Sequence, residues 1–536
     1  MATIAEYFAE QLTAAGVRRV YGLPGGENVV ILDAIRQRGI EFLLVKNESS
    51  ACFMAATEAR LTGKTGVALT TLGPGAANAY AGLAHAYLDR APVLLITAAT
   101  DPAEAGRHSH QVIDLHAVFK PVVKYTAELA PGNAVRAIGK AMTQASTDRP
   151  GPVHLRVHNR IASQRVEREP KPDATAARPA NHGSSLNEVR TLLAGKEKPI
   201  IVLGLGLEPA APYSEIRKLA ESLRAPVIDT PKSKGALPAD HALYAGALGL
   251  TRQDPVYELL DEADCIFAIG FDVVELVKPW DYQKPLIWIA SWENRDPRIS
   301  SDVELVGNVK DILSALADVK AATAVSWGVR RVRRFQDSLA AIELPRAGAN
   351  RILPQTFLNA LRANTPDDII ITTDVGSHKI FAALNWQARE PNRYFVSNGL
   401  SGMGFGLSSA IAAAEITGQT AICITGDAGL AMVMGELGLL VERQLPVLVT
   451  VMNDAALDLI RSAQQRQGHD TFGTEFRNPD FGYIARAYGL AYHKVESERD
   501  CHRAIREGLA ARAPTLIDVM IDPIGYPTTV HSSRES

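Results

Sequence analysis

Cysteine is scarce in this chain, with four among 536 residues. The four lie far apart and form neither a Cys-x-x-Cys pair nor a cysteine–histidine spacing typical of a metal site; they are Cys52, Cys265, Cys423 and Cys501. We therefore expect no disulfide framework and no structural zinc. Reduced, scattered cysteines favour a cytoplasmic location.

The sequence also has no apolar run of about 18 residues, the length expected of a membrane span. Its start carries Glu6 and Glu10 and lacks the basic and apolar segments of a signal peptide. The net charge is only −3, from 56 basic and 59 acidic side chains, so no positive excess indicates nucleic acid or an anionic membrane as partner. What is present is an ordinary globular composition, 46% hydrophobic, and a length that suggests several domains.

Short apolar runs alternate with helical patterns in three segments of the chain, 1–165, 186–325 and 350–536. Such alternation is typical of parallel sheets with helices on both faces. We predict an α/β fold of three successive parallel-sheet domains. The predicted strands are 17–23, 41–46, 65–71, 92–98 and 151–157 in the first segment, 198–205, 225–230, 264–271 and 285–291 in the second, and 368–376, 393–399, 420–427, 446–454 and 515–522 in the third.

Three stretches fall outside this alternation. Residues 163–185 are rich in proline, alanine and charge, which predicts a surface linker. Residues 327–351 are basic, and because the whole chain is nearly neutral we interpret them as a linker or a solvated helix face rather than a nucleic-acid patch. The last residues, 526–536, form a polar tail.

The strongest local signal lies between residues 420 and 457. Two predicted buried strands end at Gly426-Asp427 and at Asn453-Asp454, so both acidic side chains should reach the carboxyl edge of one sheet, where open α/β sheets bind ligands. Gly426 and Gly429 allow a ligand to approach the backbone at the start of the next helix. This arrangement suits a diphosphate held by Mg²⁺, which prefers oxygen ligands. A Gly-Asp turn alone is equally typical of a capped helix start.

This pattern resembles the diphosphate-anchoring motif of thiamin-diphosphate enzymes, Gly-Asp-Gly followed after a further strand by Asn-Asn. The sequence departs from the motif twice, with Ala428 at the third glycine and Asp454 at the second asparagine. Asp454 keeps an oxygen ligand but adds a negative charge beside a diphosphate.

The resemblance covers nearly the whole chain. The stretches GLPGGENVVILDAI, VKNESSACFMA and RLTGKTGVALTTLGPGAAN are similar to the pyrimidine-binding domain of acetolactate synthases. KSKGALPADHALYAGALGL is similar to the middle domain of their catabolic, FAD-independent branch, and DVGSHK and NGLSGMGFGLSSAI to the diphosphate-binding domain.

The resemblance implies a role for several residues in binding the cofactor. Glu48 matches the glutamate that hydrogen-bonds the aminopyrimidine and starts the reaction by an internal proton relay. Met403 matches the bulky residue that bends the cofactor, and Gly402 the backbone carbonyl that accepts from the pyrimidine amine. The diphosphate would be contacted by Ser377, His378, Gly426 and Ala428, and Mg²⁺ would be bound by Asp427, Asp454 and the carbonyl of Ala456.

The resemblance also implies a substrate pocket. Gln111 matches a glutamine that lines it and that could bond a reacting oxygen, and His110 is its neighbour. Glu27 stands where the catabolic enzymes carry a lysine that faces the substrate carboxylate. A carboxylate there would repel a second 2-oxo acid by about 1–4 kcal/mol at about 4 Å.

We therefore expect an enzyme that uses thiamin diphosphate and Mg²⁺ to decarboxylate a 2-oxo acid and join the remaining fragment to a second carbonyl compound. As in the family, a homodimer or homotetramer is expected, with no nucleic acid and no membrane as partner. The resemblance to the FAD-independent branch implies that FAD is not used. Gly-Leu-Gly at 204–206 is followed by Pro209 where a dinucleotide fingerprint needs glycine, which predicts an ordinary strand-end turn. A nucleotide pocket in the middle domain stays open, since FAD-dependent relatives use this region.

Three alternatives stay open. Glu27 favours a simple 2-oxo acid decarboxylase or an aldehyde lyase with a non-pyruvate substrate. The glycine turn at 204–206 is compatible with a second alternative, a nucleotide-binding oxidoreductase. The departures from the motif at Ala428 and Asp454 are compatible with a third alternative, a catalytically inactive cofactor-binding protein.

Overall fold

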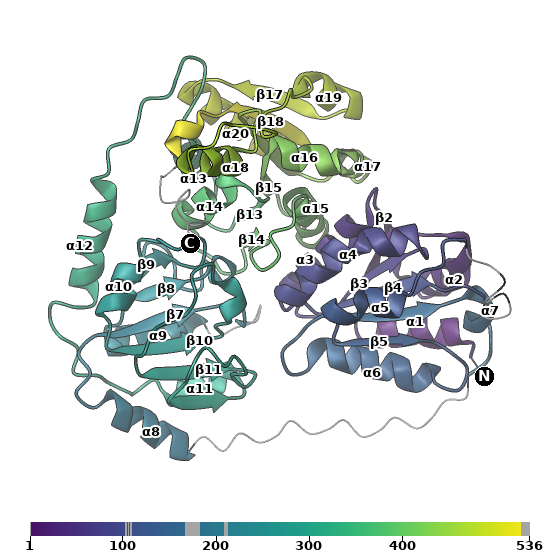
Figure 1. The fold of residues 1–536 in the computed structure, drawn as a ribbon, viewed down its shortest axis with the longest axis horizontal. Coiled ribbons are helices and arrows are strands. Elements are labelled where there is room, and N and C mark those ends of the chain that lie inside the picture. Colours follow the sequence, from purple (N-terminus) through teal and green to yellow (C-terminus); the bar gives the residue numbers. More distant parts are fainter. Residues whose placement is uncertain are drawn as a thin grey trace. The chain divides into compact units, whose positions relative to one another are not determined.

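A computed structural model describes residues 2–101, 104, 107, 110–166, 183–207 and 213–526 (Figure 1). Most of the linker expected at 163–185, residue Pro209 and the tail after residue 526 lie outside these residues. Three sheets, each of six parallel strands, account for the strands of the structure. The predicted α/β class with three parallel sheets is therefore confirmed.

The first sheet has the strand order β2-β1-β3-β4-β6-β5. Its central strands are fully buried, which explains their continuous apolar sequences. The strands are β1 (Arg19–Leu23), β2 (Glu41–Leu44), β3 (Gly66–Thr70), β4 (Val93–Ala98), β5 (Tyr125–Glu128) and β6 (Val153–Val157), and the helices are α1 (Ile4–Ala14), α2 (Val29–Gln37), α3 (Glu48–Thr62), α4 (Pro74–Leu88), α5 (Leu115–Phe119), α6 (Ala134–Ser146) and α7 (Asn159–Ala162).

The second sheet has the order β12-β11-β10-β7-β8-β9. Successive residues of β7 face opposite sides, so Ile201 belongs to one apolar core and Ile200 to the core on the other face. The strands are β7 (Pro199–Leu203), β8 (Val227–Asp229), β9 (Tyr244–Ala247), β10 (Cys265–Ile269), β11 (Leu286–Ala290) and β12 (Val303–Val306), and the helices are α8 (Gly183–Leu193), α9 (Tyr213–Leu223), α10 (Tyr257–Glu262), α11 (Val309–Ala315) and α12 (Val329–Ala340).

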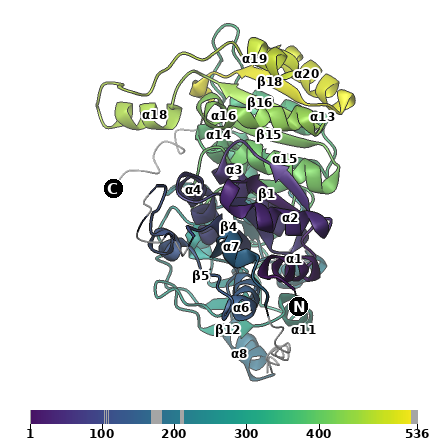
Figure 2. The ribbon, with the colours of Figure 1, turned by 90° about the vertical axis from the view of Figure 1, so that its right-hand side faces the viewer.

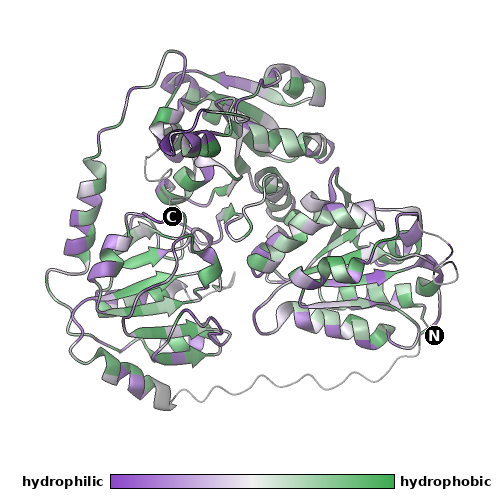
Figure 3. Cartoon of the chain, viewed as in Figure 1, coloured by the Kyte–Doolittle hydropathy of each residue, from purple (hydrophilic) through white to green (hydrophobic). Residues whose placement is uncertain are grey.

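The third sheet has the order β14-β13-β15-β16-β18-β17. Figure 3 shows that the strands of all three sheets are mainly apolar, whereas the helices carry polar residues among the apolar ones. The strands are β13 (Ile370–Thr373), β14 (Tyr394–Val396), β15 (Ala421–Gly426), β16 (Val447–Asn453), β17 (Ala491–Val495) and β18 (Thr515–Met520), and the helices are α13 (Pro354–Asn364), α14 (Ser377–Asn385), α15 (Phe405–Thr417), α16 (Asp427–Val433), α17 (Leu437–Glu442), α18 (Asp458–Arg466), α19 (Phe481–Tyr488) and α20 (Glu498–Ala511).

The basic stretch 327–351 contains helix α12, in agreement with the expected helix face. One of its arginines is not solvated, because Arg331 is 7% exposed and its guanidinium donates to the carboxylates of Glu258 and Glu262 on α10. This arginine therefore attaches α12 to the second sheet domain.

The chain divides by its contacts into two compact units. The first comprises Met1–Arg178, Gly399–Ile416 and Val433–Leu439, and the second comprises Pro179–Asn398, Thr417–Met432 and Leu440–Ser536. Each unit is described by itself below. Among the described residues, no helix is both long enough and apolar enough to traverse a membrane.

Candidate active site

In the second unit, the two acidic strand ends lie next to each other. Strands β15 and β16 are adjacent and parallel, with Gly426 opposite Met452. Asp427 follows β15 directly, and Asp454 follows the last residue of β16, so both side chains lie at the carboxyl edge of the third sheet. This is the geometry that the sequence predicts.

Asp427 is 2% exposed and is held by three donors. Its Oδ1 accepts the N–H of Ala428 at 2.8 Å, and its Oδ2 accepts the N–H of Ala455 and the side-chain amide of Asn478, each at 2.7 Å. Burial raises the pKa of Asp427, and these donors oppose the rise. The carboxylate is therefore fixed in one orientation.

Asn478 is a site residue that the sequence does not reveal. Its side-chain nitrogen donates both to Asp427 Oδ2 and, at 2.9 Å, to Oδ1 of Asn453. Asn453 in turn donates to Asp518 Oδ1 at 2.8 Å. Asn478 thus ties the ends of β15 and β16 together from the irregular segment between α18 and α19, where no periodicity marks it.

Asp454 lies in a more charged surrounding. Burial, followed by the nearby carboxylates of Asp427 and Asp458, raises the pKa of Asp454 to about 7. The guanidinium of Arg461 is 3.8 Å from Asp454 Oδ2 and opposes this rise. The Asp454 side chain is 9% exposed, and its carboxylate lies near the buried carboxylate of Asp427, which raises the pKa of Asp454. Such a pair is a donor set that a divalent cation would stabilise.

The segment after Asp454 offers a backbone oxygen. Ala455 has a positive φ of 57°, and hydrogen bonds from Phe476 N–H to Ala455 O and from Leu457 N–H to Thr474 O flank Ala456. Neither of these two hydrogen bonds uses the carbonyl oxygen of Ala456. Two carboxylates and one carbonyl fit the oxygen donors that Mg²⁺ prefers, with phosphate oxygens and water to complete six.

Among the described residues, no group of three or more His, Cys, Asp and Glu side chains is arranged to hold a metal ion by itself. A cation at Asp427 and Asp454 would therefore need ligands from the backbone and from a bound anion. This requirement agrees with a site that binds a metal and a diphosphate together.

His378 lies against the same edge. It is 7% exposed, and a Cβ added at Gly426 would lie only 3.0 Å from its Cε1. Burial lowers the pKa of His378 to about 3, so the ring is neutral, and its Nε2 has no hydrogen-bond partner among the described residues. A buried polar atom without a partner is costly unless a ligand satisfies it. In the tautomer protonated at Nε2, the ring could donate to a phosphate oxygen.

Ser377 precedes His378 at the start of α14. Its hydroxyl donates to Asp458 Oδ2 at 2.8 Å, so it connects α14 to the first turn of α18. Its side chain is thus engaged within the protein, whereas the first backbone N–H groups of the nine-residue helix α14 point to the same edge of the sheet.

In the first unit, Glu48 is the first residue of α3 and is 8% exposed. Its Oε2 accepts from the side-chain amide of Asn78 at 3.1 Å, and a Cβ added at Gly75 would lie 3.0 Å from its Oε1. Glu436 supports this helix start, since its Oε1 accepts the backbone N–H groups of Lys46 and Asn47. Glu48 is therefore a nearly buried carboxylate in a fixed position.

The loop that carries Gly402 and Met403 also belongs to the first unit. Both residues are partly buried, and a Cβ at Gly402 would lie 3.3 Å from the ring of Phe53 on α3. Asp89, at the end of α4, anchors the loop by accepting the N–H of Gly399 at 3.0 Å. Gly402 and Met403 are thus attached to the same pair of helices, α3 and α4, that carries Glu48 and Asn78.

Glu27 lies against the residue that follows β3. Its Oε2 accepts from the hydroxyl of Thr71 at 3.0 Å, and the methyl group of Thr71 would lie 2.8 Å from a Cβ at Gly75. Thr71 is therefore close both to Glu27 and to Gly75, the glycine that lies against Glu48. The structure brings Glu27 and Glu48 into one region of the first unit.

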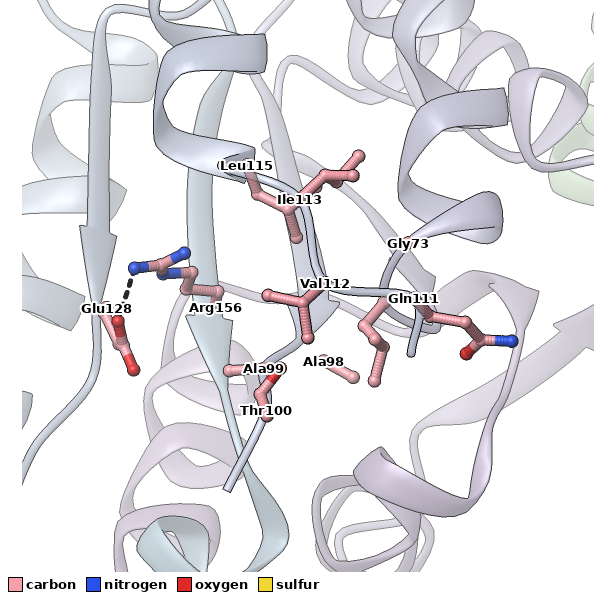
Figure 4. A pocket seen from close by; sticks show the side chains of 11 residues that line it. Gly73, Ala98, Ala99, Thr100, Gln111, Val112, Ile113, Leu115, Glu128 and Arg156 are labelled. Atoms are coloured by element: carbon pink, nitrogen blue, oxygen red, sulfur yellow. Dashed lines mark ion pairs between the residues drawn. The ribbon is translucent and has the colours of Figure 1, made fainter. Parts of the chain in front are cut away.

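Gln111 is exposed and has a positive φ of 59°. It borders a cavity of about 260 Å³ at the carboxyl edge of the first sheet, together with Leu72, Gly73, Ala98, Ala99, Thr100, Val112, Ile113, Leu115, Glu128 and Arg156. Figure 4 shows the Gln111 side chain directed away from the Arg156–Glu128 ion pair on the far side. His110 is exposed next to Gln111, while His108 lies outside the described residues.

In the middle sheet, the topological switch point lies between β7 and β10, where dinucleotides bind in related architectures. In this protein, side chains of the chain itself lie at the switch point. Glu275 is 1% exposed and accepts the N–H of Leu205 at 2.8 Å, and a Cβ at Gly206 would lie 2.5 Å from the ring of Trp292. The Gly-Leu-Gly segment is a strand-end turn, as the sequence indicates.

Comparison with known proteins gives three family matches in chain order. Residues 2–118 match the N-terminal TPP binding domain of thiamine pyrophosphate enzymes, residues 186–316 match the central domain, and residues 374–519 match the C-terminal TPP binding domain. Thiamine pyrophosphate is another name for thiamin diphosphate.

Curated relatives match over nearly the whole chain. The acetolactate synthase large subunit of Buchnera aphidicola subsp. Acyrthosiphon pisum is 30% identical, over 90% of this chain and 88% of its own. The probable acetolactate synthase large subunit of Methanocaldococcus jannaschii is 29% identical, over 97% and 92%. The acetolactate synthase of Bacillus subtilis is 28% identical, over 97% and 93%.

Proposed function

Since the chain belongs to the thiamine pyrophosphate enzyme family, as an acetolactate synthase-like member, we propose that it decarboxylates a 2-oxo acid and joins the remaining fragment to a second carbonyl compound. The observation that carries this proposal is a pair of carboxylates on adjacent strand ends, that of Asp427, which is buried, and that of Asp454, whose side chain is 9% exposed. Both side chains supply oxygen donors for a metal, although Asp454 stands where the family motif has asparagine.

The proposed roles of the second unit follow from its contacts. Asp427, held by three donors, and Asp454 would bind Mg²⁺ with the carbonyl of Ala456. His378 Nε2 would donate to the diphosphate. Gly426 allows the anion to approach, and Ala428 contributes the start of α16.

When bound, thiamin diphosphate supplies a nucleophilic carbon and an electron sink for the decarboxylation. In the first unit, Glu48 would hold a proton at its carboxylate oxygen against a ring nitrogen of the cofactor, in the orientation that Asn78 fixes. Met403 and the carbonyl of Gly402 would position the rings. Gln111, beside His110, would donate to a reacting carbonyl oxygen.

A panel of 2-oxo acids, scored for CO₂ and for ligated product with and without thiamin diphosphate and Mg²⁺, tests the proposal. We expect Glu48→Gln to reduce turnover by at least about 100-fold while the cofactor still binds. Glu58→Gln, farther along the same helix, is the matched control and should keep turnover. Normal turnover by Glu48→Gln would contradict the assignment.

Glu27 favours a second candidate, a decarboxylase or aldehyde lyase that releases an aldehyde. Its carboxylate is held by Thr71, directly after β3, in the same region of the first unit as Glu48, where it would repel a second 2-oxo acid. If wild type releases free aldehyde and Glu27→Gln shifts the products towards ligation, the second candidate holds. If wild type forms the ligated product from pyruvate alone, the first holds.

We also propose that the enzyme works without FAD, because the Glu275 carboxylate already occupies the backbone N–H of Leu205 at the switch point. The four cysteines are all buried and free, which supports the cytoplasm as its location. We expect a homodimer or homotetramer, and light scattering of the holoenzyme would measure it. A flavin spectrum in the purified protein would contradict the first of these points.

A further inference from the structure

Asp454 poses an electrostatic problem that its neighbours address. It places a second carboxylate beside Asp427, where the family motif has a neutral asparagine. A diphosphate bound at this edge would meet both carboxylates and that of Asp458, which is 8% exposed. Like charges at such separations disfavour the bound anion unless a cation compensates them.

Arg461 is the side chain placed to do so. Its guanidinium lies 2.9 Å from Asp458 Oδ1, 3.8 Å from Asp454 Oδ2 and 3.8 Å from Glu475 Oε1. The side chain is only 18% exposed, so solvent screens these pairs less than it would on an open surface. Figure 2 shows α18, the helix that carries Arg461, standing clear of the third sheet. The 3.8 Å between the Arg461 guanidinium and Asp454 Oδ2 nevertheless connects this helix to the end of β16.

The same network reaches the other side of the site. Asp458 accepts from Arg461 with one oxygen and from the hydroxyl of Ser377 with the other. Ser377 begins α14 and precedes His378. Arg461 is therefore connected through one shared carboxylate to the helix start that would face the diphosphate.

We propose that Arg461 is a positioning residue that compensates the charge of Asp454, so that an aspartate can take the place of the motif's second asparagine without loss of diphosphate affinity. This inference rests on the proposed function, because it concerns the same metal and diphosphate. Three carboxylates, Asp427, Asp454 and Asp458, and one guanidinium leave two negative charges, which one divalent cation would neutralise.

A double-mutant cycle on the full-length protein tests it, with Arg461→Gln, Asp454→Asn and the double variant. The measurement is the Kd of thiamin diphosphate at saturating Mg²⁺, from fluorescence quenching or calorimetry. We expect Arg461→Gln to raise Kd by at least about tenfold. Asp454→Asn, which retains an oxygen ligand, should change Kd by less than about threefold, and the double variant should lie within about threefold of Asp454→Asn.

Two further variants separate charge from structure. Arg461→Lys keeps the cation and should remain within about threefold of wild type, even if Arg461→Gln proves unstable. Arg503→Gln removes an arginine from an i,i+3 ion pair with Asp500 on α20, away from the site, and is the matched control, with unchanged Kd.

Equal losses from Arg461→Gln in the wild-type chain and in the Asp454→Asn variant would overturn the proposal, and so would a tenfold loss in Arg461→Lys. If wild type binds no thiamin diphosphate at all, the proposed function fails and this inference fails with it. If wild type binds and the cycle shows no coupling, only the role of Arg461 is wrong.

Discussion

Replacing Asn478 by alanine should weaken cofactor binding although Asn478 is not itself a proposed ligand. The change removes one hydrogen bond to the Asp427 carboxylate and one to the amide of Asn453. A hydrogen bond to a charged group contributes about 1.5–3 kcal/mol and a neutral one about 0.5–1.5 kcal/mol. Their sum, about 2–4.5 kcal/mol, is an upper bound because Asn478 is partly exposed and water can replace part of it.

Asp427 would keep the N–H groups of Ala428 and Ala455, so the carboxylate would be loosened rather than released. Loss of a group that orients a metal ligand typically lowers affinity by about 10–100-fold. We therefore expect the Kd for thiamin diphosphate with Mg²⁺ to rise by that factor, measured by calorimetry on protein whose circular dichroism is unchanged.

The matched control is Asn364→Ala. Asn364 also makes two side-chain hydrogen bonds, to Ala360 O and to the ring of His502, but on α13 and α20 rather than at the strand ends. It should lower the melting temperature and leave the Kd unchanged. If Asn478→Ala bound the cofactor within about twofold of wild type, the reasoning that Asn478 fixes Asp427 would be refuted.

Three other changes have defined outcomes. Burial raises the pKa of Glu275 to about 8. Between the ordinary pKa of 4.5 and 8, the folded state therefore binds more protons than the unfolded state. The free energy of unfolding should therefore fall as the pH rises through this range. Glu275→Gln should lessen the slope of stability against pH by at most about 1.4 kcal/mol per pH unit, in calorimetric melts from about pH 5 to 8. The part of the slope that remains belongs to other raised carboxyls such as Asp454, and an unchanged slope would contradict the role of Glu275. Gly429→Ala should lower the free energy of unfolding in urea by about 1–3 kcal/mol, because the new Cβ would lie 2.5 Å from the buried Asp374 carboxylate. The control Ala428→Gly should lower it by no more than about 1 kcal/mol. Chelation of divalent cations should raise the Kd of thiamin diphosphate by at least about tenfold, and equal binding without metal would contradict a metal at Asp427.

The predicted strands are all present in the structure, and the strands that sequence analysis missed share one property. These are β5, β9, β12 and β17, and each lies at an edge of its sheet. An edge strand has one open side, and in β17 only Val495 is buried. The missed strands lack the continuous apolar run that identifies a central strand of a parallel sheet. The edge strands β2 and β14, whose sequences EFLL and YFV are more apolar, were predicted.

The site residues likewise differ in how far the sequence predicts them. Asp427 and Asp454 were predictable because each directly follows a central strand, and the ladder between β15 and β16 fixes where those strands end. Asn478 was not, because it comes from an irregular segment whose position depends on the tertiary fold. The hydrogen bond between Ser377 and Asp458 likewise joins two helix starts that are far apart in the sequence.

The contacts of Arg461 are partly predictable from the sequence. Once α18 is known to start at Asp458, the i,i+3 spacing places Asp458 and Arg461 on one face of the helix. The departure from the motif at Asp454 and the cation that opposes its charge then belong to one short local segment. A substitution at a strand end is constrained by the ladder, but its compensation can come from the next helix along the chain, where side chains vary without disturbing the sheet. An aspartate at this position in related chains should therefore occur with a basic residue one or two turns into the following helix, and an asparagine should not require one.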